Sequence, residues 1–170
     1  IRVHDLNELK QALKVARQLK LSWKVHWPFE DWIVKDHGFN GIIIRLCGAF
    51  ERIEQTEDDI DIGAAALWSE LNQHATWLNE MSTWPGSVGA VFSNGQGHCL
   101  KGYHLELELL KGTRVIRRIY TNKDSIVDVE KGAIPIKLRI RGRRLRKRNG
   151  PMKAGLIFEE TGDAVIERAI

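Results

Sequence analysis

Apolar residues near the start of the chain recur at the spacing of an amphipathic helix. The residues with this spacing are Leu9, Leu13, Ala16 and Leu19. Asp5 precedes them, and Glu8 stands three positions after it, as in a capping box that satisfies free N–H groups at a helix start. We therefore expect a helix from about Leu6 to Leu19.

Shorter segments have the alternation or the β-branched content of strands. These segments are residues 22–26, 42–46, 52–54, 59–62, 105–109, 115–120 and 136–140. Lys111-Gly112 separates two of them, so the sequence predicts a hairpin at that point. The apolar cluster Ile42 to Ile44 has the length of a buried strand.

Two further helices and a loop system are predicted. Residues 63–65 lead into a second helix, and the glycine-rich segment 85–102 is typical of ordered loops around a short helix or strand. A third helix is predicted at 163–169. The inner face of the second helix would consist of Leu67, Trp68, Leu71 and Ala75.

The mixture of helices and strands favours an α+β class. Most strands have close neighbours in sequence as their expected partners, which argues against a doubly wound parallel sheet. A chain of 170 residues is long enough for one domain, or for two small lobes that share a core.

The net charge of +4 is unevenly distributed, because one segment is rich in acids and another in bases. Residues 51–61 are acidic, whereas 137–148 hold no acid. The cations of this basic segment are Lys137, Arg139, Arg141, Arg143, Arg144, Arg146, Lys147 and Arg148. They form either a solvated strand face, with Ile136, Leu138 and Ile140 facing the core, or an anion site for nucleic acid or an acidic protein. Without aromatic residues, nucleic-acid contacts there would be to phosphate and nonspecific.

Other site classes are disfavoured by the sequence. No apolar run approaches the roughly 20 residues of a membrane span. Cys47 and Cys99 show no metal or redox spacing, so a reducing, cytoplasmic location is expected. The histidines lack metal-site spacing, and Ser87 does not lie in a nucleophile elbow, so neither a metal nor a hydrolase site is predicted.

Several motifs occur in the order found in a known enzyme family. The strongest is Trp84-Pro85-Gly86-Ser87-Val88-Gly89-Ala90, followed by Asn94, and another is Asp36 with Gly38-Phe39-Asn40-Gly41. Segments 122–125 and 154–158 match more weakly. These motifs resemble the I-P-G-T-V-G-A, G-F-x-G, Y-R-x-S and A-G-S-x-F motifs of the UDP-N-acetylenolpyruvoylglucosamine reductases (UDP-N-acetylmuramate dehydrogenases).

The resemblance implies a fold and a cofactor. Enzymes of this family act in peptidoglycan precursor synthesis and use FAD and NADPH to reduce an enolpyruvyl group. Two lobes hold FAD and a third holds the substrate. The resemblance therefore implies a first FAD-binding-like lobe over 1–46, a second over 47–150, and the start of a largely missing substrate lobe over 151–170. Residues 84–90 and Asn94 would contact the flavin.

The chain departs from the family at the positions that carry its chemistry. The pyrophosphate loop, G-x-G-S-N in the family, corresponds to Trp27, Phe29, Glu30 and Asp31, so large rings and carboxylates replace small neutral donors. The family's catalytic positions correspond to Lys123, Ser125 and Leu156. Leu156 replaces the proton donor and has no proton to give, so no catalytic residue is predicted.

Three hypotheses follow from this pattern. The first is a noncatalytic binding or scaffold module that needs no cofactor; in it the tryptophans either pack the core and rim, or Trp27 or Trp84 fills the vacated cleft. The second is a working FAD-dependent oxidoreductase with altered flavin geometry. The third is a weak nucleic-acid-binding module that uses the basic segment.

Overall fold

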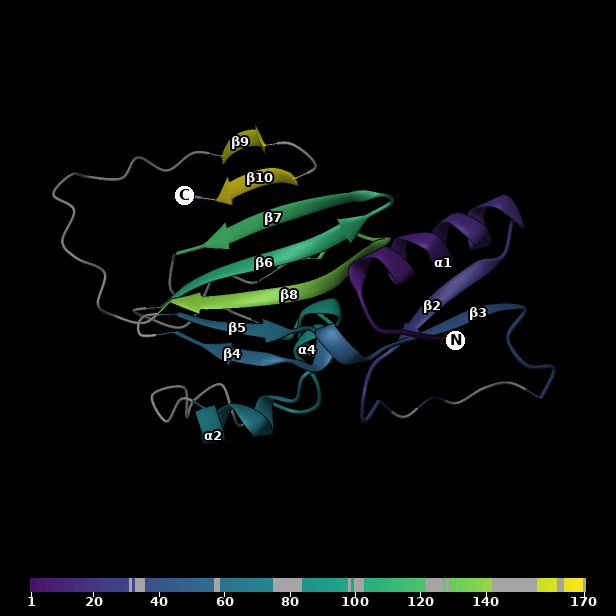
Figure 1. Cartoon of the computed structure of the whole chain (residues 1–170), viewed down its shortest axis with the longest axis horizontal. Coiled ribbons are helices and arrows are strands. Elements are labelled where there is room, and N and C mark those ends of the chain that lie inside the picture. Colours follow the sequence, from purple (N-terminus) through teal and green to yellow (C-terminus); the bar gives the residue numbers. More distant parts are fainter. Residues whose placement is uncertain are drawn as a thin grey trace, which may run out of the picture.

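The computed structural model describes most of the chain as two sheets together with several helices (Figure 1). Helix and strand labels follow Figure 1. The described residues are 1–30, 32, 36–56, 59–74, 84–97, 99, 103–121, 127 and 129–141, together with the backbone of 156–161 and 164–169.

The first sheet is parallel and small, with strand order β1-β3-β2. Its strands are β1 (Arg2–Val3), β2 (Ser22–His26) and β3 (Gly41–Leu46). In β3 Ile44 is buried while Ile43 is 36% exposed. The predicted strand over Ile42 to Ile44 is confirmed, but only Ile44 of the three is buried, because neighbouring side chains of a strand point to opposite faces.

Helix α1 (Leu6–Gln18) connects β1 to β2, as the helical spacing predicted. The Asp5 carboxylate accepts a hydrogen bond from the Glu8 N–H at 2.9 Å. The Glu8 carboxylate accepts from the His4 N–H at 2.6 Å, one residue before the partner expected in a capping box. Leu9, Leu13 and Ala16 are buried, whereas Leu19 lies beyond the helix and is 62% exposed.

The second sheet has seven strands in the order β4-β5-β8-β6-β7-β10-β9. All neighbours are antiparallel except β10 and β7. The predicted hairpin of β6 and β7 is confirmed, but β5 pairs with the distant β8, against the expectation of close partners. The strands are β4 (Ile53–Gln55), β5 (Asp59–Gly63), β6 (His104–Lys111), β7 (Arg114–Tyr120), β8 (Ala133–Arg141), β9 (Leu156–Thr161) and β10 (Ala164–Ala169).

Two of the predicted helices take other forms. Residues 164–169 form β10 instead of a helix, because hydrogen bonding to β9 and β7 on its two sides holds the backbone extended. The second helix is broken up, because Leu67 bridges to Ser87 in extended form. The elements after Leu67 are η2 (Trp68–Glu70) and α2 (Leu71–His74); Ala75 lies outside the described residues.

Two remaining elements frame the region between the sheets. The 3-10 turn η1 (Gly48–Glu51) follows β3, and α4 (Val88–Ser93) is the short helix expected in the glycine-rich segment. No helix among the described residues is long and apolar enough to cross a membrane.

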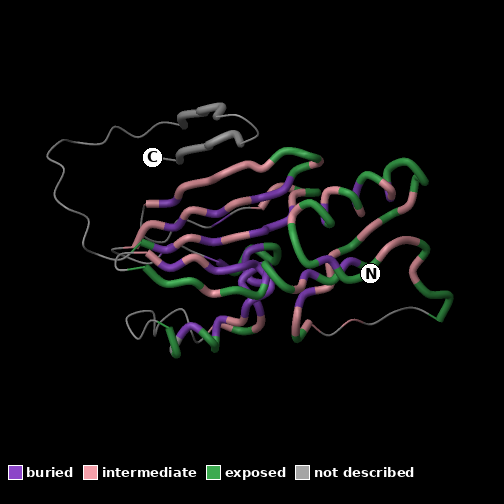
Figure 2. The backbone as a smooth tube through the Cα atoms, viewed as in Figure 1, coloured by how far each residue is buried: buried purple, intermediate pink, exposed green. Residues whose placement is uncertain are grey.

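The buried residues form two clusters. Helix α4 packs on one face of the large sheet through a first cluster that includes Leu105, Leu107 and Leu138 (Figure 2). The second cluster joins α1 and β3 to one end of the large sheet and contains Leu110 and Ile136.

Ile136 therefore leaves the face shared by Leu138 and Ile140. The register between β6 and β8 slips after the pair Glu108 and Lys137, because the next pair is Leu109 and Pro135. This β-bulge leaves Ile136 without a partner on β6 and turns it toward the opposite face. The prediction that all three residues face the core is confirmed, but Ile136 packs in the second cluster, whereas Leu138 and Ile140 pack in the first.

Candidate functional site

The start of α4 satisfies its own backbone groups. The Ser87 Oγ accepts from the Ala90 N–H at 3.3 Å, and Gly86 supplies a left-handed φ of +75° before it. The Val88 N–H donates to the Ala66 carbonyl at 3.0 Å, and the Gly89 N–H to the Ala64 carbonyl at 2.7 Å. The N–H groups that make helix starts attractive to phosphate are therefore occupied by protein acceptors here.

The first loop keeps a turn that suits glycine, although its residues are bulky. The Glu30 N–H donates to the Trp27 carbonyl at 3.3 Å, with Pro28 and Phe29 between them. Phe29 has a φ of +57° and is 82% exposed. The left-handed region costs a residue with a side chain roughly 1–2 kcal/mol. The family motif has glycine at this position, so the loop retains the conformation without the residue that favours it.

The two loops meet through the ring of Trp27. Trp27 is 4% exposed and belongs to the core cluster that also holds Ala64 and Ala90. A Cβ atom at Gly89 would lie 2.2 Å from Cζ3 of Trp27, so the indole rests directly against the backbone of α4. The junction, as we call Trp27–Glu30 together with the first turn of α4, is closed by this ring.

The carboxylate of Glu30 is used inside the junction. Its Oε2 accepts from the Trp32 Nε1–H at 2.9 Å and lies 3.4 Å from the Trp27 N. The Glu30 carbonyl lies 3.2 Å from His26 Nε2, and the His26 ring meets Trp32 edge-on at 5.0 Å. A phosphate approaching this loop would meet a negative charge where the family motif has a neutral serine.

A cavity of about 490 Å³ lies beside the junction. Two lysines, Lys24 and Lys131, line it together with aromatic and apolar residues. The Lys24 Nζ lies 5.8 Å from the ring centroid of Trp32. The other lining residues are Trp23, Val25, Trp27, Glu30, Ser93, Asn94, Gly132, Ala133, Ile134 and Pro135.

The residues at the junction do not fit FAD in the position that the resemblance implies. A pyrophosphate there would need the space of the Trp27 ring, and N–H groups that already donate to Ala64, Ala66 and Ser87. It would also lie next to Glu30. Each of these features disfavours a doubly charged group.

The other predicted cofactor residues and the catalytic position Leu156 lie in different parts of the fold. Trp84 packs edge-on against Trp68 at 4.7 Å and Phe92 at 6.2 Å, so it joins the core beneath the sheet, while Trp27 is the ring at the junction. Asn94 ends α4 and lines the cavity. Leu156 begins β9 at the far edge of the large sheet.

Several predicted positions lie outside the described residues. They are Asp31, Lys123, Ser125, Arg143, Arg144, Arg146, Lys147 and Arg148. Among the residues that are described, no group of three or more metal-ligating side chains comes together.

The described cations of the basic segment share one face of the sheet, as predicted, but they form ion pairs with aspartates of β5. Arg139 binds Asp61 with two hydrogen bonds, at 2.5 and 2.8 Å, and the Lys137 Nζ lies 2.6 Å from the same carboxylate. Arg141 pairs with Asp59 at 3.1 Å. The hydrogen bond from Arg139 is the main reason that the pKa of Asp61 falls to about 2 from its ordinary 3.8.

This charged face extends to β6 and β7. Arg117 lies 3.0 Å from both Glu106 and Glu108. The alternation of Asp59 and Asp61 with isoleucines predicted a polar face on this strand. The pairing of these aspartates with the basic segment, however, depends on β5 lying next to β8. Local patterns did not predict that neighbour.

The chain is similar in part to curated UDP-N-acetylenolpyruvoylglucosamine reductases, although no protein-family model matches it. The relative from Acidiphilium cryptum is 39% identical over 70 residues, covering 38% of this chain and 23% of that enzyme. The one from Halalkalibacterium halodurans is 29% identical over 101 residues, covering 56% and 34%. A Bacillus cereus relative is 28% identical over 96 residues, covering 53% and 32%. The chain thus spans roughly a third or less of their length.

Solved structures show the same fold at low sequence identity. A carbon monoxide dehydrogenase from Hydrogenophaga pseudoflava, lacking the Mo-pyranopterin moiety of its cofactor, matches with a TM-score of 0.53 and 12% identity, over 94% of this chain and 62% of that one. The cyanide-inactivated Cu,Mo-CO dehydrogenase matches with a TM-score of 0.51, 14% identity and the same coverage. The fold is mixed α/β, consistent with the FAD-binding type that the resemblance implied.

Proposed function

We propose that this chain is a noncatalytic binding or scaffold module that uses an FAD-binding type of fold. The observation that carries the proposal is the contact between Trp27 and Gly89, which fills the space between the two loops that resemble flavin-binding loops. The fold keeps its two lobes together at the junction by apolar packing rather than by a shared cofactor.

Two further features support this proposal. The N–H groups of Val88, Gly89 and Ala90 already donate within the protein. The proton-donor position of the family motif holds Leu156, whose side chain has no exchangeable proton. A change that admitted the flavin would therefore still leave the reduction without its acid.

Absorption and thermal unfolding in the presence of FAD test the proposal. FAD at 100 times its Kd would stabilise the folded state by about 2.7 kcal/mol. We expect a colourless protein whose melting temperature does not move at saturating micromolar FAD. A yellow preparation, or a concentration-dependent rise in melting temperature, would contradict the proposal. Trp27→Phe is a matched variant, since it keeps a ring at the junction and should also stay colourless.

A flavin-dependent reductase is the second candidate. The cavity of about 490 Å³ beside the junction, with Lys24 and Lys131 among its lining residues, is the feature that favours it, together with the partial similarity to the reductases. FAD would then lie in altered geometry. The test is NADPH oxidation that depends on the enolpyruvyl substrate. We expect background rates for the unaltered chain and for Leu156→Ser, and turnover by either would favour this candidate.

Nucleic-acid binding is a weaker proposal that rests on the closely spaced cations of 143–148, a segment without an acidic residue. Nonspecific binding would have a Kd of roughly 10⁻⁴–10⁻⁶ M and would weaken steeply with salt. Changing Arg143, Arg144, Arg146 and Arg148 to Gln should abolish it. Arg139→Gln is the matched control, because Arg139 already pairs with Asp61 and should contribute little. Fluorescence anisotropy with a labelled RNA at two salt concentrations separates the outcomes.

A further inference from the structure

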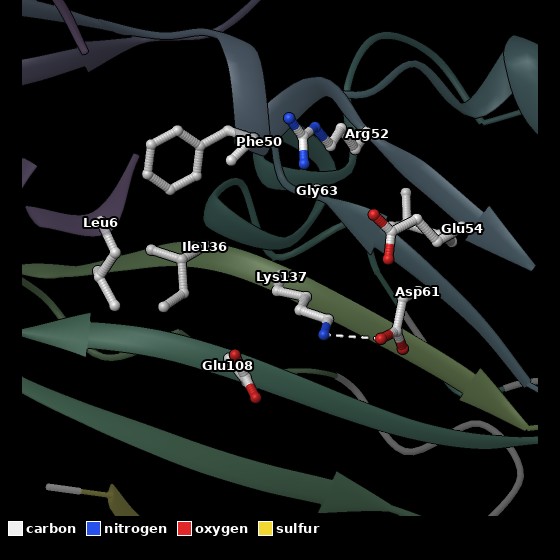
Figure 3. Close-up of a pocket in the computed structure, with 11 residues that line it drawn as sticks. Leu6, Phe50, Arg52, Glu54, Asp61, Gly63, Glu108, Ile136 and Lys137 are labelled. Atoms are coloured by element: carbon white, nitrogen blue, oxygen red, sulfur yellow. Dashed lines mark ion pairs between the residues drawn. The ribbon is translucent and has the colours of Figure 1, made fainter. Parts of the chain in front are cut away.

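A second cavity, of about 230 Å³, opens between the start of α1 and the charged face of the large sheet (Figure 3). Leu6, Phe50 and Ile136 gather on one side of it, and the charged side chains lie on the other. The charged residues are Arg52, Glu54, Asp61, Glu108 and Lys137. None of the residues that line this cavity belongs to the junction.

The apolar wall results from two backbone irregularities. A Cβ atom at Gly63 would lie 2.1 Å from the Phe50 carbonyl oxygen, so glycine is what allows the main chain of Phe50 to cross β5 at this point. The bulge in β8 turns Ile136 to the same side as Lys137. Together these features place apolar surface directly beside charged groups.

The charges of the cavity are incompletely compensated. Glu54 lies opposite Asp61 in the pairing of β4 with β5, and like charges in that position repel. Asp61 has Lys137 and Arg139 as partners, and Glu108 has Arg117. Among the described residues, neither Arg52 nor Glu54 has an ion-pair partner. One cation and one carboxylate are therefore left for a ligand.

We propose that this cavity binds a small zwitterion with an apolar side chain, such as a free α-amino acid of the size of leucine. Its carboxylate would pair with Arg52, and its ammonium group would lie at Glu54, where it also relieves the repulsion from Asp61. Its side chain would contact Leu6, Phe50 and Ile136. The cavity is smaller than the roughly 300–1,000 Å³ of sites for drug-sized ligands, which suits such a molecule.

Three probes that differ only in charge separate the parts of this proposal. L-Leucine carries both charges, 3-methylbutylamine lacks the carboxylate, and 4-methylpentanoate lacks the ammonium group. Isothermal titration should give leucine an affinity at least about 10-fold above that of either analogue, a gap of about 1.4 kcal/mol. The experiment uses no flavin, so its outcome is independent of the proposed function.

Two substitutions test which residue binds each charged group of the ligand. Arg52→Gln should weaken leucine by on the order of 10-fold and leave the amine unchanged, whereas Glu54→Gln should weaken leucine and leave 4-methylpentanoate unchanged. Lys14→Gln, on α1 and outside the cavity, is the control. The proposal is overturned if leucine, isoleucine, methionine and phenylalanine all fail to bind at about 10 mM, since a Kd of that size corresponds to a binding free energy of only about 3 kcal/mol. It is also overturned if both analogues bind as tightly as leucine and neither variant changes their affinity.

Discussion

The junction and the charged face both combine apolar side chains with polar groups, but they differ in whether those groups and the space beside them remain accessible. At the junction, polar groups are bound internally and an indole ring fills the space between two loops. On the charged face, Asp61 and its cations stay at the surface, and a cavity remains open beside them. The difference teaches that a matching motif does not establish a binding site. What decides is whether the backbone and side-chain groups of the motif are still available to a ligand.

The largest effect is expected where packing dominates. Trp27→Ala should lower the free energy of unfolding by about 3–5 kcal/mol, because it removes a buried ring. Gly89→Ala should cost about 1–3 kcal/mol in the unaltered chain through overpacking, and close to nothing when Trp27 is already alanine. Urea unfolding of the two single variants and the double variant measures this coupling. Equal costs of Gly89→Ala in both backgrounds would show that the ring does not rest on α4.

The charged face should show its contribution as a dependence on pH. The pKa of Asp61 is about 2 when folded, below its ordinary 3.8. Its stabilising effect is therefore complete above about pH 4 and is lost as the pH falls toward 2. Asp61→Asn should flatten that part of the stability curve and cost about 1–2 kcal/mol at neutral pH. Asp59→Asn, which removes a single pair to Arg141, should have a smaller effect. Chemical unfolding at pH 2, 4 and 7 makes the comparison.

The helix cap at Ser87 should contribute less to the free energy of unfolding than the ring of Trp27. Ser87→Ala removes the acceptor of the Ala90 N–H and should cost about 1 kcal/mol. Ser93→Ala, at the exposed end of the same helix, serves as the control and should be near neutral. A loss at position 87 no greater than at position 93 in thermal unfolding would mean that the motif serine has no capping role.

The smallest effect should be a gain in stability. Phe29→Gly relieves a left-handed strain of roughly 1–2 kcal/mol, partly offset by about 0.4–1 kcal/mol of unfolded-chain entropy. A net stabilisation of about 0.5 kcal/mol is expected. Phe29→Ala keeps the strain and should not reproduce it. If both variants behave alike, the turn is not held in the left-handed region.

Sequence patterns predicted those parts of the fold that depend on neighbours in the chain. Helical spacing located α1, alternation located the strands, and Lys111-Gly112 located the hairpin of β6 and β7. The resemblance to the reductases singled out Trp27 and Trp84 as rings that fill a vacated cleft or serve as ordinary packing, and it did not decide between them.

The errors have physical causes that act over longer distances. Residues 164–169 form too short a run to distinguish helix from strand by periodicity, and pairing with β7 and β9 decides their conformation. The bulge at Ile136 depends on how two strands align. Both the neutralisation of the basic strand and the cavity at Arg52 depend on β5 lying beside β8, which local alternation does not encode.

The placement of β5 beside β8 also governs how the chain reaches its folded state. Asp61 and Arg139 are 78 residues apart, yet they share two hydrogen bonds. Closing so long a loop costs conformational entropy before any native contact compensates for it. Proteins rich in pairings between distant residues therefore fold slowly. The hairpin of β6 and β7 can form early, whereas β8 acquires its second neighbour only after the intervening segments are arranged. Until then the edge of β8 is open to strands of other molecules, and the ion pairs of Asp59 and Asp61 with its cations form only when β5 covers that edge.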